Sequence, residues 1–102
     1  MLAQDFDNLV LEENEASREM LLYKASEYAS EGDRLSNFKH AAGLRGTNPA
    51  DALVGMLVKH FESVSEMSKS PHGYTREKWD EKLRDIRNYT YLLKAVLHDI
   101  GV

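Results

Sequence analysis

Apolar residues recur at three- and four-residue intervals along almost the whole of this 102-residue chain. That spacing matches the 3.6-residue period of an α-helix, not the two-residue alternation of a half-buried strand. A helix with one apolar stripe must bury the stripe against another element. Because the sequence also lacks strand-like alternation, internal repeats and low-complexity tracts, we predict an all-α fold.

The first predicted helix covers residues 5–29. Its apolar stripe consists of Phe6, Leu9, Val10, Ala16, Met20, Tyr23 and Tyr28. Glu13, Lys24 and Glu27 fall close to this stripe. These three side chains therefore either edge the core and extend their charges outward, or line a polar cleft.

A short second helix is predicted next, with Asp33 as its N-cap and its end in the glycines of residues 43–46. Its buried side is expected to consist of Leu35, Phe38, Ala41 and Ala42. The strongest helix start in the chain follows it. There, Asn48 is a suitable cap, Pro49 suits the first helical position, and Asp51 lies near the exposed amides.

The third predicted helix runs from this start to about Met67. Its core stripe consists of Leu53, Met56, Leu57, His60, Val64 and Met67. A loop with Pro71 and Gly73 follows in residues 68–74, and Thr75 caps a fourth helix. The seam of that helix consists of Leu83, Ile86, Leu93, Leu97 and Ile100. We therefore predict a four-helix bundle forming a single domain over residues 1–102, since a chain this short cannot bury two independent cores.

The charge of the chain limits its partners. A net charge of -4 without local basic clusters argues against direct binding of nucleic acid and against anionic membrane surfaces.

The absence of cysteine excludes disulfides and thiolate chemistry. Asp5 and Asp7 stand where a secretory signal needs basic residues, and no apolar run approaches the roughly 18 residues of a membrane span. We expect a cytoplasmic protein.

Carboxylate and amide side chains on the last two helices carry the main functional signal. Glu81, Asp85 and Asn88 share a strip about 60° wide, which continues into Leu92, as expected where a bundle seam opens into a cleft. On the third helix, Glu62 and Glu66 are one turn apart, and Lys59 precedes Glu62 by one turn. Magnesium prefers such oxygen ligands on rigid elements. The alternative is plain surface charge paired with Lys78, Lys82 and Arg84.

Other side chains leave two interpretations open. His60 lies in the apolar stripe of the third helix, where it is either a neutral core imidazole or a ligand or base. Trp79 and Tyr89 are either core aromatics or surfaces for stacking a nucleobase. His40, His72 and His98 have no partner at a helical spacing and receive no role.

Three strings between Asn37 and Leu93 carry a family resemblance: N-F-K-H-A-A, M-L-V-K-H-F-E-S-V-S-E-M and W-D-E-K-L-R-D-I-R-N-Y-T-Y-L-L. This part, a little over half of the chain, resembles small helical proteins of phages and prophages. Those proteins look like distant members of the MazG-type all-α nucleotide pyrophosphohydrolases. The most specific residues are Lys59, His60, Trp79, Glu81, Lys82, Asp85, Asn88 and Tyr89.

The resemblance implies cleavage of nucleoside triphosphates to monophosphates with magnesium held by helix carboxylates. The implied metal ligands are Glu62, Glu66, Glu81 and Asp85, and the implied phosphate- or nucleotide-binding residues are Lys59, Lys82 and Asn88. The chain departs from the family pattern, because the family has E-x-x-E and E-x-x-D whereas both acidic pairs here are four residues apart. Lys82 stands three residues before Asp85, where the family has glutamate.

These observations lead to a predicted MazG-like, magnesium-dependent nucleotide pyrophosphohydrolase or a catalytically lapsed relative. The alternative is a non-catalytic helical protein-interaction module that binds a partner through a bundle face. Helix four offers two long apolar seams with additional Tyr91 and Val96. Because one small bundle cannot cover all of this surface, we also expect a homo-oligomer, most simply a dimer.

Overall fold

The computed structural model describes the backbone of residues 1–28 and 32–102 and the side chains of residues 1–23 and 32–102. In this part, four α-helices follow one another: α1 (Ala3–Tyr28), α2 (Ser36–Arg45), α3 (Pro49–Ser68) and α4 (Arg76–Asp99). A 3-10 turn, η2 (Pro71–Gly73), lies between α3 and α4. No strand occurs in the described residues, so the predicted all-α fold with one short helix is confirmed. The predicted end of the first helix, at residue 29, lies outside them.

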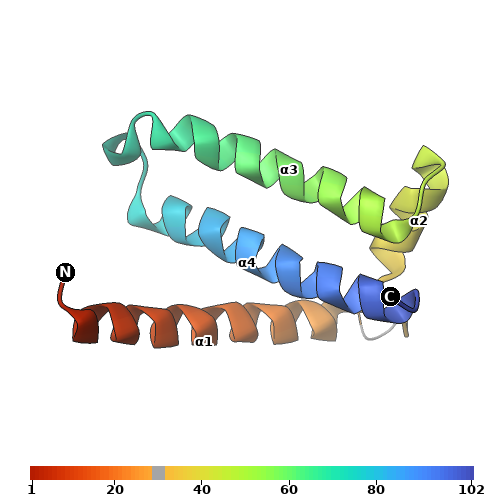
Figure 1. Cartoon of the computed structure of the whole chain (residues 1–102), viewed down its shortest axis with the longest axis horizontal. Helices are drawn as coiled ribbons and strands as arrows, with labels where there is room; N and C mark the ends of the chain where they lie inside the picture. Colours follow the sequence, from red (N-terminus) through yellow and green to blue (C-terminus); the bar gives the residue numbers. More distant parts are fainter. Residues whose placement is uncertain (29–31) are drawn as a thin grey trace.

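The helices form an open bundle (Figure 1). α3 and α4 run antiparallel side by side, and α2 packs against α3. α1 packs against α4 and runs in the same direction as α4. Among the described helices, none combines the length and apolar character that a membrane crossing requires.

The helix boundaries follow local side-chain chemistry in most places. Asn48 Oδ1 accepts a hydrogen bond of 3.0 Å from the Asp51 amide, and Pro49 opens α3, as predicted. Thr75 Oγ1 likewise accepts from the Lys78 amide at the start of α4. Gly46 ends α2 with a φ of 66°, in the left-handed region where glycine carries no steric penalty.

The start of α2 differs from its prediction. Asp33 is not the N-cap, because α2 begins at Ser36 and its cap position is Leu35. Asp33 Oδ1 instead accepts a hydrogen bond of 2.9 Å from the Leu35 amide, in the turn before the helix. The carboxylate of Asp33 therefore stabilises the entry turn. A backbone hydrogen bond of 3.2 Å, which Ser36 N donates to Asp33 O, leads into the helix.

The core lies where α2, α3 and α4 meet. Its central buried cluster consists of Leu35, Phe38, Leu53 and Val96. The ring of Phe38 meets that of Tyr89 edge to face at 6.4 Å. Val96 is only 1% exposed, so the expectation that it contributes to a seam between copies is wrong. It packs inside its own chain because its side of α4 faces α2 and α3.

The apolar stripe of α1 is poorly covered. Phe6, Leu9 and Val10 are all exposed, contrary to the prediction of one buried stripe. α1 is attached to α4 through Arg87, whose Nε donates to Ser17 Oγ and whose Nη2 donates to Glu13 Oε2, both at 2.8 Å. Glu13 therefore forms a half-buried ion pair between helices. The side chains of Lys24 and Glu27 lie outside the described residues.

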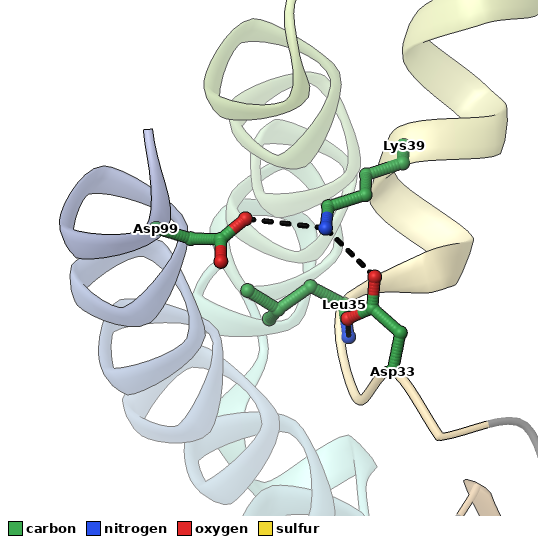
Figure 2. A network of polar contacts seen from close by, with 4 residues as sticks. All are labelled: Asp33, Leu35, Lys39 and Asp99. Atoms are coloured by element: carbon green, nitrogen blue, oxygen red, sulfur yellow. Dashed lines mark hydrogen bonds and ion pairs between the residues drawn. The ribbon is translucent and has the colours of Figure 1, made fainter. Parts of the chain in front are cut away.

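A second polar network joins α2 to the far end of α4 (Figure 2). Lys39 Nζ lies 2.7 Å from Asp33 Oδ2 and 3.2 Å from Asp99 Oδ2. The hydrogen bond from Lys39, with that from the Leu35 amide, holds the pKa of Asp33 below its ordinary range. Hydrogen bonds to Asp33 and then Asp99 raise the pKa of Lys39. The network thus fixes the entry turn of α2 against the C-terminal end of α4.

The core assignment predicts a contrast between two neighbouring residues of α3. Leu53 is fully buried, so Leu53→Ala should cost about 2–5 kcal/mol of unfolding free energy. Val54 lies about 100° further around the helix and is 40% exposed, so Val54→Ala should change stability by less than about 0.5 kcal/mol. Urea unfolding measures both, and equal losses for the two variants would contradict this core.

The Asp33 network predicts an acid dependence. Because the folded-state pKa of Asp33 is lowered, its stabilising contribution is present at neutral pH and is lost as the pH falls through that pKa. The melting temperature of the wild type should therefore fall more between about pH 7 and about pH 3 than that of Asp33→Asn. Asp7→Asn, a change at an exposed position of α1, is the control and should follow the wild type. Parallel curves for wild type and Asp33→Asn would refute the network.

Candidate functional site

A pocket of about 590 Å³ lies between the four helices. Its size falls within the range typical of small-molecule sites. α1 contributes Met20 and Leu21, and α3 contributes Met56 and His60. α2 and its entry turn contribute Arg34, Asn37, Phe38, His40, Ala41 and Leu44. α4 contributes Asp85, Asn88, Tyr89 and Leu92. The pocket therefore has apolar walls with polar groups from three elements.

His60 and Asp85 are neighbouring polar side chains in the lining of the pocket. His60 Nδ1 lies 3.9 Å from Asp85 Oδ2, which is too long for a direct hydrogen bond. The His60 ring also packs on the Tyr89 ring at a centroid distance of 4.9 Å. Both side chains keep partial exposure, 21% for His60 and 37% for Asp85. His60 is thus a pocket residue rather than an enclosed core imidazole.

Asn88 contributes a buried side-chain amide to the pocket. Its side chain is 6% exposed, and its Oδ1 atom is buried without a hydrogen-bond partner in the described part of the chain. A buried carbonyl oxygen without a donor costs on the order of 1–3 kcal/mol, so folded proteins rarely keep one without a reason. A hydrogen-bond donor on a bound molecule would satisfy this oxygen.

The strip predicted on the fourth helix lies partly in the pocket. Asp85, Asn88 and Leu92 all line it, as a seam opening into a cleft requires. Glu81 and Lys82 precede Asp85 by one turn of α4, but neither side chain lines the pocket. Glu81 is exposed, and Lys82 is half-buried.

The predicted residues of the third helix lie elsewhere. Lys59, Glu62 and Glu66 are exposed, and none of them lines the pocket. Glu62 follows His60 by two residues, about 200° around the helix, so it points away from the pocket. Glu66 pairs with Lys69 at 2.9 Å on the surface. The structure therefore brings Asp85 and Asn88 together but does not add the acidic pair of α3.

The possible metal ligands are dispersed. Within the side chains of residues 1–23 and 32–102, no three of histidine, aspartate and glutamate come close enough together to hold a metal ion. The four predicted carboxylates thus do not fit a magnesium cage in this described part. Magnesium stays a prediction from the family resemblance.

Several pocket residues were missed in the sequence. Arg34, Asn37 and His40 received no role, yet they line the α2 side of the pocket. Arg34, Phe38 and Ala41 recur at four- and three-residue spacing, so their common face was a usable signal. No spacing in the sequence indicates that this face lies near Asp85 and Asn88, because their proximity depends on how the helices pack.

The buried Asn88 Oδ1 has no hydrogen-bond partner in the described part of the chain, and this predicts that the protein can lose this atom without losing stability. Asn88→Leu keeps a similar volume and removes the orphaned oxygen, so it should leave the stability of the ligand-free protein unchanged or raise it. The matched change is Ser17→Ala, which removes a buried acceptor of Arg87 and should cost about 1–3 kcal/mol. Urea unfolding of both variants tests this pair. A loss with Asn88→Leu as large as that with Ser17→Ala would mean that Asn88 has a structural role.

Comparisons of the chain with family models, with curated proteins and with solved structures gave no match. The family resemblance therefore rests on the three strings between Asn37 and Leu93. The candidate site rests on three geometric observations: the pocket between the helices, the neighbouring His60 and Asp85, and the buried Asn88 Oδ1, which has no hydrogen-bond partner among the described residues.

Proposed function

We propose that this chain binds a nucleotide in the central pocket. The observation that carries the proposal is the buried Asn88 Oδ1, which has no hydrogen-bond partner among the described residues and lies with Asp85 in a pocket of small-molecule size. Both groups are hydrogen-bond acceptors when Asp85 is ionised. The matching edge of the ligand therefore carries N–H donors, as the amino and imino groups of nucleobases do.

The rest of the lining supports the same ligand class. Tyr89 and Phe38 provide aromatic surface, and Met20, Met56 and Leu92 provide apolar walls, which together suit a planar ring. Arg34 lines the α2 side of the pocket and suits an anionic group such as phosphate. A nucleotide has both a planar, donor-bearing end and an anionic end, so it suits this lining.

Hydrolysis is the catalytic form of this proposal, and it comes from the family resemblance. A pyrophosphohydrolase needs a group that takes a proton from the attacking water. His60, which lines the pocket next to Asp85, is the candidate for that role. In a lapsed relative, the pocket would bind the nucleotide without cleaving it.

A non-catalytic interaction module is the second candidate. Val54, Val58 and Phe61 form an exposed apolar stripe on α3 at four- and three-residue spacing. Such a stripe suits a protein partner. This candidate requires no ligand in the pocket.

Binding is tested by thermal melts and calorimetry with a panel of nucleoside mono- and triphosphates, each with and without magnesium. A ligand at 100 times its Kd should stabilise the wild type by about 2.7 kcal/mol. Asp85→Asn and Asn88→Leu should each weaken binding at least about tenfold, a loss of about 1.4 kcal/mol. Glu62→Gln is the matched control, because this exposed carboxylate lies outside the pocket.

The outcomes separate the candidates. Pyrophosphate release by the wild type distinguishes an enzyme from a lapsed binder. A loss of magnesium-dependent binding with Glu62→Gln as large as that with Asp85→Asn would favour the four-carboxylate site over the pocket. If no nucleotide shifts the melting temperature with or without magnesium, nucleotide binding is refuted and the interaction module is favoured.

A further inference from the structure

The N-terminal part of α1 is an apolar surface that its own chain leaves uncovered. Phe6, Leu9 and Val10 recur at three- and four-residue spacing and are 54%, 44% and 40% exposed. The described polar ties between α1 and α4 are those of Arg87 to Glu13 and Ser17, which lie further along the helix. An apolar stripe of this kind is normally covered by another element or another molecule.

The facing part of α4 is uncovered as well. Arg87 of α4 contacts Glu13 of α1. Because the two helices run in the same direction (Figure 1), the turn before Arg87 lies opposite the turn before Glu13. Leu83 occupies that turn of α4 and is 41% exposed. Figure 1 shows the two helices separating toward their N-termini. We call this surface of Phe6, Leu9, Val10 and Leu83 the α1–α4 wedge.

The total surface of the chain is large enough to include an interface with another copy. The accessible surface is 7214 Å², whereas a compact monomer of 11.6 kDa exposes about 5,800 Å². The radius of gyration is 15.7 Å, against about 13 Å for a compact domain of this length. The excess of about 1,400 Å² exceeds the roughly 800 Å² that each partner buries in a standard dimer. An interface of dimer size is therefore available.

The distribution of charge favours the N-terminal segment of another copy as the occupant of the wedge. Residues 1–15 carry five carboxylates and no lysine or arginine: Asp5, Asp7, Glu12, Glu13 and Glu15. The N-terminal half of α4, residues 76–87, carries five cations and four carboxylates, a net charge of +1, against a net charge of -5 for residues 1–15. An acidic, apolar helix packing against this half of α4 would meet both its leucine and its cations.

We propose that a second copy of this chain occupies the α1–α4 wedge. In the resulting two-fold dimer, the N-terminal part of each α1 packs against the N-terminal half of α4 in the other copy. This arrangement buries the wedge on both copies and brings the acidic N-terminal segment of one copy against a segment of the other that carries a net charge of +1. It is independent of any ligand in the pocket, and it differs from the seam at Tyr91 and Val96 expected from the sequence.

Light scattering after size exclusion tests the dimer. At tens of micromolar, the wild type should have about twice the mass of 11.6 kDa. Phe6→Asp and Leu83→Asp should each weaken dimerisation at least about tenfold, because they place a charge in an apolar contact. Val58→Asp is the matched control, since Val58 is 44% exposed on α3, away from the wedge. Circular dichroism checks that each variant keeps its helix content.

Cross-linking provides a second test that does not introduce charge. The chain contains no cysteine, so a mixture of Leu9→Cys and Leu83→Cys proteins can form disulfides only between the introduced residues. The mixed disulfide should form faster than one between Leu9→Cys and Val58→Cys. A wild type that stays monomeric overturns the proposal. It is also overturned if Val58→Asp dissociates the dimer while Phe6→Asp and Leu83→Asp do not, or if the mixed disulfide has no preference.

Discussion

The packing of Leu35 and Phe38 against Leu53 and Val96 is the contact on which the remaining structure depends. These four side chains join α2 and its entry turn to α3 and α4. The helices α3 and α4 also pack against each other as an antiparallel pair. The contact fixes α2 across one end of that pair. The face of α2 that includes Phe38 also lines the pocket, together with residues of α3 and α4.

The pocket follows from this arrangement through helix periodicity. Phe38 belongs both to the core cluster and to the pocket lining, and Tyr89 contacts Phe38 on one side and His60 on the other. Asp85 and Asn88 precede Leu92 along the same strip of α4, so a core that positions Leu92 also positions them. The network of Asp33, Lys39 and Asp99 holds α2 at its outer edge. Pocket geometry and core stability are thus linked.

Features set by neighbouring residues were predictable from the sequence. Asn48, Pro49 and Thr75 mark helix starts through bonds within one turn, and the strip of Asp85, Asn88 and Leu92 follows from spacing alone. Features set by packing between helices were not. The sequence does not show that Glu62 points away from the pocket, that His60 meets Asp85, or that Val96 is buried while Phe6 is not. Asp33 misled the prediction because its carboxylate serves the turn just before the helix.

The central claim is that a nucleotide binds in the pocket through Asn88, and NMR of the asparagine side-chain amides tests it most directly. The chain has asparagines inside the pocket, at Asn37 and Asn88, and outside it, at Asn8, Asn14 and Asn48. On titration with a nucleotide, the account predicts saturable shifts of the Asn88 and Asn37 amide signals, with the other three unchanged. Shifts of Asn8, Asn14 or Asn48 without a shift of Asn88, or no shift at all, would contradict it.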